Sequence, residues 1–156
     1  VPIGNYDLNS VRSQIGVMIN HQDIFYGSVW ENITLGNENI TIENVNTLSV
    51  KAGLTDFIAT LKNGYDTLLD PTGKRLPRSV IHKILLVRAL AGQPRLLLLE
   101  EPWMNFENNQ RNQIIQLIKE FQNSTVVIVS NDEEFAGHCS KIITMNDDGS
   151  SITSKS

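Results

Sequence analysis

Apolar and polar positions alternate in blocks along the second half of the chain. Residues 96–99 (LLLL) and 125–129 (TVVIV) are short apolar runs between polar or turn-forming residues, which is typical of strands buried in a parallel sheet. Between them, residues 108–122 place apolar side chains three and four positions apart, which predicts an amphipathic helix. Further strands are expected at 142–145 and near Ile152. This strand–helix–strand order predicts an α/β fold.

The region between residues 28 and 92 predicts mostly helices. Ser28, Thr41 and Thr55 are candidate N-caps, and Pro77 and Gly92 fit the beginning and end of a longer helix. Helices are therefore expected at 29–35, 40–53, after Thr55 and at 77–91, with a further short one at 132–138. Residues 1–9 read as turn-rich, and residues 62–76 as a polar loop.

Composition narrows the class of protein. The 156 residues suffice for one domain, and 40% hydrophobic with 19% charged residues is typical of a globular chain. The formal net charge of −4 argues against a nucleic-acid partner. The single cysteine, Cys139, excludes an internal disulfide and favours a reducing compartment.

Two adjacent acids, Glu100 and Glu101, follow the leucine run directly. Ligands of open α/β sheets bind at the carboxyl ends of the strands, and a carboxylate there can hold Mg²⁺ while a second acid orients water for phosphoryl transfer. The glycine-rich phosphate loop that completes such a nucleotide site, G-x-x-x-x-G-K-[ST], does not occur in this chain.

Three longer segments carry a family resemblance: QIGV…DIFYGSVWENITLG (14–36), AGLTDFIATLKNGYDTLL (52–69) and VRALAGQPRLLLLEEP (87–102). From about Tyr6 to Gly149, the chain resembles the nucleotide-binding domain of ABC transporters of the exporter type, which includes toxin and peptide secretion systems. The resemblance implies a P-loop NTPase-like partial parallel sheet with an ABC helical subdomain. It places the helical subdomain at 28–92, the α/β core at 1–27 and 93–149, and a tail that we expect to fray at 150–156. The phosphate loop of the family would precede Val1.

Against this pattern, the family's LSGGQ motif corresponds to Leu76, Pro77, Arg78, Ser79 and Val80. That motif presents a hydroxyl and glycine N–H groups to the terminal phosphate across a dimer. The proline removes a hydroxyl and an N–H donor, and the residues after it add side chains where glycines allow close approach. We expect the arginine to be solvated or paired with an acid rather than bound to phosphate.

The other site positions implied by the resemblance are also altered. Asn20 stands where the family has a glutamine that reaches Mg²⁺, and Asn131 stands at the switch histidine. Glu100 replaces the family's metal-shell aspartate, and Glu101 matches the catalytic glutamate, here interpreted as vestigial. The alternative for this acid pair is that backbone N–H groups and water satisfy the two carboxylates. The D-loop corresponds to residues 104–107 and lacks its aspartate.

The resemblance thus predicts a degenerate exporter ATPase domain with a structural or regulatory role. ATP and Mg²⁺ are its implied cofactors, and we expect the chain neither to bind ATP tightly nor to hydrolyse it. Implied partners are transmembrane domains, contacted through the loop 20–27, and a second nucleotide-binding domain, at the cytoplasmic face of the inner membrane.

Two alternatives remain open: an active ATPase whose partner and upstream segment complete the site, and an interaction module outside transport. Apolar edges at 96–99 and 125–129 predict self-association.

Overall fold

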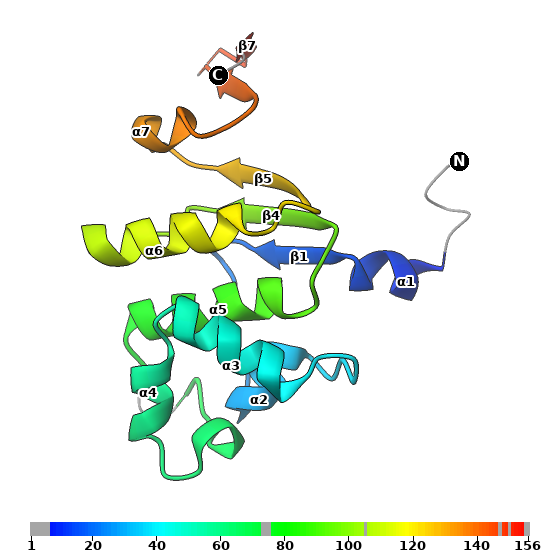
Figure 1. Cartoon of the computed structure of the whole chain (residues 1–156), viewed down its shortest axis with the longest axis vertical. Helices are drawn as coiled ribbons and strands as arrows, with labels where there is room; N and C mark the ends of the chain where they lie inside the picture. Colours follow the sequence, from blue (N-terminus) through cyan, green and yellow to red (C-terminus); the bar gives the residue numbers. More distant parts are fainter. Residues whose placement is uncertain (1–6, 73–75, 105, 147, 150, 155–156) are drawn as a thin grey trace.

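A three-stranded parallel sheet forms the centre of the molecule (Figure 1). The computed structural model describes residues 7–72, 76–104, 106–146, 148–149 and 151–154. The strands are β1 (Ile15–Met18), β4 (Leu96–Glu100) and β5 (Thr125–Val129), in the order β1-β4-β5. Because β4 pairs on both sides, the prediction that residues 96–99 would expose an edge was wrong: Leu97 and Leu99 are 0% and 2% exposed.

Two helices pack against this sheet. The long helix α5 (Arg78–Ala91) contacts β1 so closely that a Cβ atom on Gly16 would lie 2.0 Å from the carbonyl oxygen of Ala89. The amphipathic helix α6 (Asn108–Lys119) lies beside β4 and β5 (Figure 1). Its buried isoleucines and leucine share one core with the β4 leucines, as the helical spacing predicted. The α/β class predicted from the sequence is therefore confirmed.

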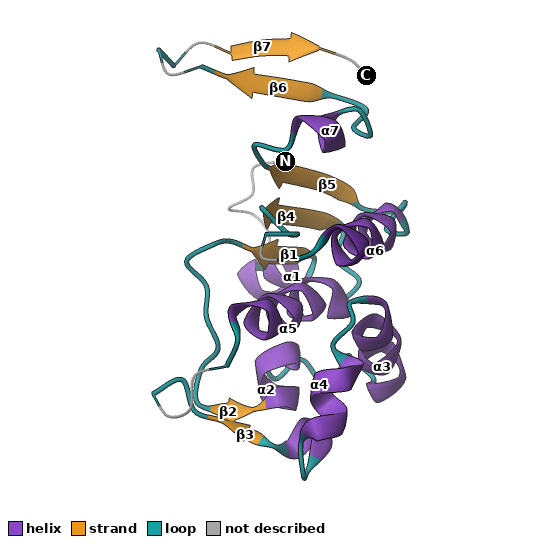
Figure 2. Cartoon of the chain, turned by 90° about the vertical axis from the view of Figure 1, so that its left-hand side faces the viewer, coloured by secondary structure: helices purple, strands orange, loops and turns teal. Residues whose placement is uncertain are grey.

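Short helices gather on the other side of α5 (Figure 2). They are α2 (Val29–Thr34), α3 (Ile42–Lys51) and α4 (Thr55–Thr60), followed by the 3₁₀ turn η2 (Gly64–Asp66). Ser28 and Thr41 cap α2 and α3 as expected, whereas Thr55 is the first residue of α4 and its cap position is Leu54. The expected loop 62–76 contains η2 and a strand, β3 (Leu68–Leu69), which pairs antiparallel with β2 (Gly27–Ser28).

The two ends of the described chain are more regular than the sequence suggested. A helix, α1 (Leu8–Ser13), is capped by Asp7 and begins inside the segment 1–9 that was expected to be turn-rich. After β5 come α7 (Glu133–Ala136), β6 (Ile142–Met145) and β7 (Ser151–Ser154). The last two strands pair antiparallel, which confirms the strand expected near Ile152, whereas the expectation that the tail would fray is wrong for residues 151–154. No helix in the described residues has the length and apolar content that a membrane crossing requires.

Candidate functional site

The carboxyl edge of the sheet brings together four positions singled out in the sequence. Parallel strands end at the same edge, so Asn20 after β1, the acid pair at the end of β4 and Asn131 after β5 converge there. Hydrogen bonds between these segments confirm the proximity. Asn20 lies 80 or more positions before the other three residues in the sequence, so the sheet topology is what brings them together.

Glu100 is bonded to the end of the neighbouring strand. Its Oε2 atom accepts a hydrogen bond from the backbone N–H of Asn20 at 2.9 Å, which joins β4 to the end of β1. The Asn20 side chain itself does not complete this contact: its Oδ1 atom is buried and has no hydrogen-bond partner in the described structure. The carboxylate thus contacts backbone rather than the amide group that the family resemblance emphasised.

Glu101 is bonded on the opposite side, to the segment after β5. Its Oε2 accepts from the Ser130 hydroxyl and its Oε1 from the Asn131 N–H, both at 2.8 Å. The backbone of Glu101 donates to the Val129 carbonyl at 2.9 Å. Its φ of +43° is unusual for a residue with a side chain, and this turn directs the carboxylate back toward β5. Both carboxylate oxygens therefore have protein partners.

A buried histidine holds the loop that follows these acids. His82 on α5 is 5% exposed, and its Nδ1 lies 2.9 Å from the carbonyl oxygen of Met104. Since a carbonyl only accepts, this ring nitrogen carries the hydrogen. Burial lowers the pKa of His82, the Met104 carbonyl opposes that effect, and the charge of Arg78 lowers the pKa further. In the sequence, His82 is a lone histidine on an apolar helix face, and this pattern does not distinguish a hydrogen-bonding role from simple packing. Of the D-loop positions 104–107, Asn105 lies outside the described residues.

The segment from Leu76 to Val80 forms the beginning of α5. Pro77 occupies the N-cap position, makes no side-chain capping bond, and accepts the N–H groups of Val80 and Ile81 at 3.0 and 3.2 Å. Arg78 is paired with Asp23, in the loop after β1, at 3.6 Å, and both side chains are more than half exposed. Of the N–H groups at this turn, those of Arg78 and Ser79 remain outside the helix ladder, and proline supplies none.

A polar network that the sequence pattern did not reveal fixes the loop after β1. Asn32 on α2 is 0% exposed. Its side-chain amide donates to the carbonyls of Phe25 and Ser28 and accepts the Phe25 N–H, all at 3.0 Å. Arg88 on α5 donates to the Asn32 backbone carbonyl at 2.6 Å. The loop is thereby held with Phe25 and Tyr26 41% and 68% exposed.

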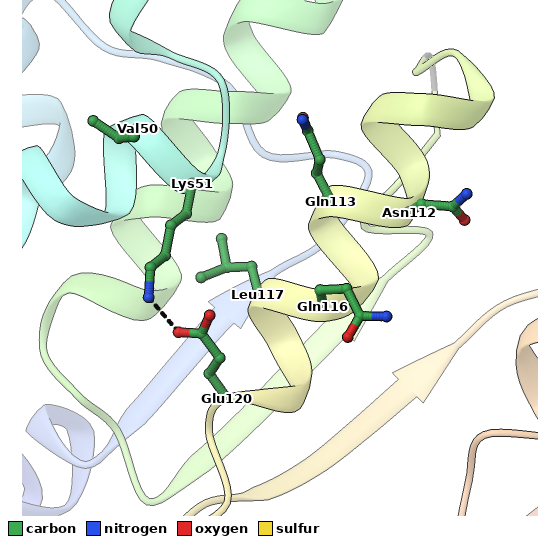
Figure 3. A pocket seen from close by; sticks show the side chains of 7 residues that line it. All are labelled: Val50, Lys51, Asn112, Gln113, Gln116, Leu117 and Glu120. Carbon is green, nitrogen blue, oxygen red and sulfur yellow. Dashed lines mark hydrogen bonds and ion pairs between the residues drawn. The ribbon is translucent and has the colours of Figure 1, made fainter.

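A groove of about 380 Å³ lies elsewhere, between α3 and α6 (Figure 3). An ion pair between Lys51 and Glu120 crosses it, and amide side chains of α6 line one wall. None of the site residues predicted from the sequence lines this groove. Within the described residues, no three His, Cys, Asp or Glu side chains gather into a metal-binding group.

The resemblance implies Mg²⁺–ATP at the carboxyl edge of the sheet, and the residues present do not fit that group. Mg²⁺ is bound by oxygen atoms in near-ideal octahedral geometry. Here both oxygens of Glu101 and one of Glu100 accept protein hydrogen bonds, and Asn20 Oδ1 is closed off from solvent. At the α5 turn, proline stands in place of a donor to phosphate.

Comparisons with known proteins place the chain. No family model matches it. It is 30% identical over 149 residues to "Multidrug resistance protein 1" of Plasmodium falciparum, covering 94% of the chain and 10% of that protein. It is 31% identical over 141 residues to "Leukotoxin export ATP-binding protein LtxB" of Aggregatibacter actinomycetemcomitans, covering 90% of the chain and 20% of that protein.

The fold is similar to that in a solved structure, "Structure of a bacterial Atm1-family ABC exporter with ATP bound". The TM-score is 0.79 at 21% identity, over 90% of this chain and 25% of that one. The chain thus spans between a tenth and a quarter of the length of the proteins it matches. The sequence similarity over most of the chain, together with the shared fold, shows that it belongs to the ATP-binding domains of ABC transporters.

Proposed function

We propose that the chain is part of an exporter ATP-binding domain that does not hydrolyse ATP and acts structurally or as a regulator in coupling to the transporter. The observation that carries this proposal is the turn before α5. Binding of a terminal phosphate at this helix N-terminus requires backbone N–H groups with little side-chain bulk around them. Pro77 removes one donor, and the neighbouring Arg78 is paired with Asp23.

The parts suited to docking are intact, which supports a coupling role. Five hydrogen bonds of 3.2 Å or less hold the loop 20–27: three join the Asn32 side chain to backbone groups of Phe25 and Ser28, and two run from Arg88 to Asn32. Tyr26 and Phe25 are presented outward on this loop. Exposed aromatic side chains on a rigid loop are suited to a protein interface. The partners proposed are the transmembrane domains of the exporter and a second nucleotide-binding domain, at the cytoplasmic face of the membrane.

The similarity to a leukotoxin export protein supports a toxin or peptide secretion system as the setting. A second candidate function is an active ATPase whose partner domain and upstream phosphate loop complete the site. The retained pair Glu100–Glu101 at the end of β4 favours it, because acids at this position serve phosphoryl transfer in the family. Both candidates place the chain in an exporter, and they differ in whether Glu101 touches the attacking water.

ATP turnover of the full-length protein assembled with its partner domain, measured for the wild type and for Glu101→Gln, separates the two. For a non-hydrolysing domain, turnover is expected to be the same for both proteins and at the assay background. An active site would lose at least about tenfold in rate on this substitution, since a group that orients water contributes on the order of 10²–10⁴-fold. The matched control is Glu38→Gln, an exposed acid in the loop between α2 and α3. Turnover that falls with Glu101→Gln and survives Glu38→Gln would overturn the proposal.

A further inference from the structure

The two acids at the end of β4 contact opposite neighbours in the sheet. Glu100 accepts the N–H of Asn20 beyond β1, and Glu101 accepts the Ser130 hydroxyl and the Asn131 N–H beyond β5. Only the central strand of a three-stranded sheet can reach both ends in this way, and β4 is that strand. The geometry points to a structural role: the two carboxylates fasten the carboxyl ends of β1 and β5 to β4.

The backbone at Glu101 supports this assignment. Its φ of +43° lies in the left-handed region, which a residue with a side chain adopts only when its surroundings hold it there. Three hydrogen bonds do so: two to the carboxylate and one from the N–H of Glu101 to the Val129 carbonyl. Ser130 is held in turn, because its oxygen accepts the Asp132 N–H at 3.1 Å. The carboxylate is thus part of a closed set of contacts.

This arrangement also accounts for the poor fit to Mg²⁺ described above. A carboxylate oxygen that accepts a short hydrogen bond from a backbone N–H has already been desolvated and oriented by that donor. Recruiting it to a cation or to an attacking water would use the remaining lone pair of that oxygen and weaken the link between strands. The inference concerns the same site as the proposed function and rests on it, since that function assigns these two acids no catalytic task.

Unfolding of the purified protein without nucleotide tests the structural role. Glu101→Ala leaves two donors without their acceptor, and Glu100→Ala leaves one, so both variants are expected to unfold at lower temperature. For a chain of this length, the loss at Glu101 corresponds to a fall on the order of 5 °C or more. Glu101→Gln retains one acceptor and is expected to lie between the wild type and Glu101→Ala. Glu38→Ala is the control and is expected to leave the midpoint unchanged.

A role in catalysis or metal binding predicts the opposite result. Removing a functional acid from a polar site commonly leaves stability unchanged or raises it. A midpoint that stays level or rises in Glu100→Ala and Glu101→Ala would overturn the inference. So would a rise of the wild-type midpoint in millimolar Mg²⁺ that Glu100→Ala abolishes, because binding to the folded state alone stabilises it.

Ser130→Ala provides a further check. If Ser130 acts through Glu101, the double variant Glu101→Ala/Ser130→Ala should lose less than the sum of the single losses. Additive losses would contradict the proposed contact. ATP turnover is a separate measurement: turnover with a reduced midpoint would reject the proposed function and leave the structural role standing, whereas no turnover with an unchanged midpoint would do the reverse.

Discussion

Arg88 donates through Nε to the backbone carbonyl of Asn32 at 2.6 Å and through Nη2 to its side-chain oxygen at 3.2 Å. The two residues lie 56 positions apart, on α5 and α2. This pair fixes α2 to the helix that packs on the sheet. It also connects the loop 20–27 to the core, because the same Asn32 amide bonds Phe25.

Asn32→Ala is therefore expected to destabilise the protein strongly. The substitution leaves partly buried backbone groups of Phe25 and Ser28, and the Arg88 guanidinium, without the Asn32 side chain, and we expect a loss of about 2–4 kcal/mol in the free energy of unfolding. Urea unfolding measures this value. Asn39→Ala, at an exposed position in the following loop, is the control and should change the free energy by less than about 0.5 kcal/mol. Equal effects of the two substitutions would contradict the role of the network.

His82 predicts a pH dependence of stability. Its pKa is lowered in the folded protein by burial, so the folded state binds fewer protons than the unfolded state just below the unfolded value of about 6.5. The contribution of His82 to stability is thus complete above about pH 6.5 and is lost as the pH falls through the lowered pKa.

His82→Asn should remove this dependence while keeping a donor for the Met104 carbonyl. Urea unfolding at several pH values between about 5 and 7.5 is expected to give a smaller slope for the variant than for the wild type. His21→Asn, at an exposed position after β1, is the matched control and should keep the wild-type slope. A wild-type slope in His82→Asn would show that other groups cause the dependence.

The sequence pattern predicted correctly those helices and strands that are defined by their own residues. The run of β-branched residues at Thr125–Val129 and the run at Ile142–Met145 form strands with the predicted bounds. Pro77 and Gly92 flank α5 as expected; the ring of Pro77 restricts its own φ, whereas Gly92 has an ordinary φ of −78° and the left-handed φ of +49° falls on Gln93. By contrast, β3 exists only because Leu68–Leu69 meets Gly27–Ser28 some forty residues earlier, and no local signal marks such a pairing.

The same distinction applies to the residues of the candidate site and their hydrogen-bond partners. The acids at the end of a buried strand could be recognised from the residues, because apolar runs and their flanks are visible in the sequence. Their partners could not: Glu100 bonds a backbone N–H 80 positions away, and Asn32 was one polar residue among several in a short helix. Backbone donors carry no sequence signature, so hydrogen bonds to them appear only once the fold is known.

Asp132 predicts a second, more acidic transition. Burial alone would raise the pKa of Asp132, but the Phe135 N–H and the Arg111 guanidinium outweigh it, so the pKa lies below its ordinary value. Arg111 Nη2 lies 2.7 Å from Asp132 Oδ2, and both side chains are less than one-fifth exposed. For a carboxylate with a lowered pKa, the contribution to stability is present above the unfolded value of about 3.9 and is lost as the pH falls through the folded value.

Asp132→Asn should therefore destabilise the protein near neutral pH and flatten the loss of stability below about pH 4. Because the partly buried Arg111 would keep only its ion pair with the exposed Glu134 at 3.2 Å, we expect a decrease of about 2–3 kcal/mol at pH 7. Glu133→Gln, an exposed acid in the first turn of α7, is the control. Chemical unfolding across the acid range distinguishes the two variants; parallel curves for wild type and Asp132→Asn would contradict the assignment.

The second edge of β5 has no strand beside it among the described residues. The Thr125 N–H and the Val129 carbonyl bond toward β4, so by alternation the backbone groups of Val126 and Ile128 face the free edge. The side chains of Val127 and Val129, on one face of β5, are 47% and 65% exposed. Residues 123–131 contain no charge, proline or glycine, which are devices that protect edge strands.

We therefore predict that the purified chain self-associates through β5, in agreement with the expectation from its sequence. Val127→Lys places a charge in the middle of this strand and should shift the protein toward monomer, because a desolvated lysine opposes strand pairing. Light scattering over a range of concentrations measures the shift. Ile143→Lys on β6 is the matched control, since that residue is 55% exposed on the separate hairpin. A wild-type monomer at all concentrations, or equal effects of the two lysines, would rule out β5 as the contact.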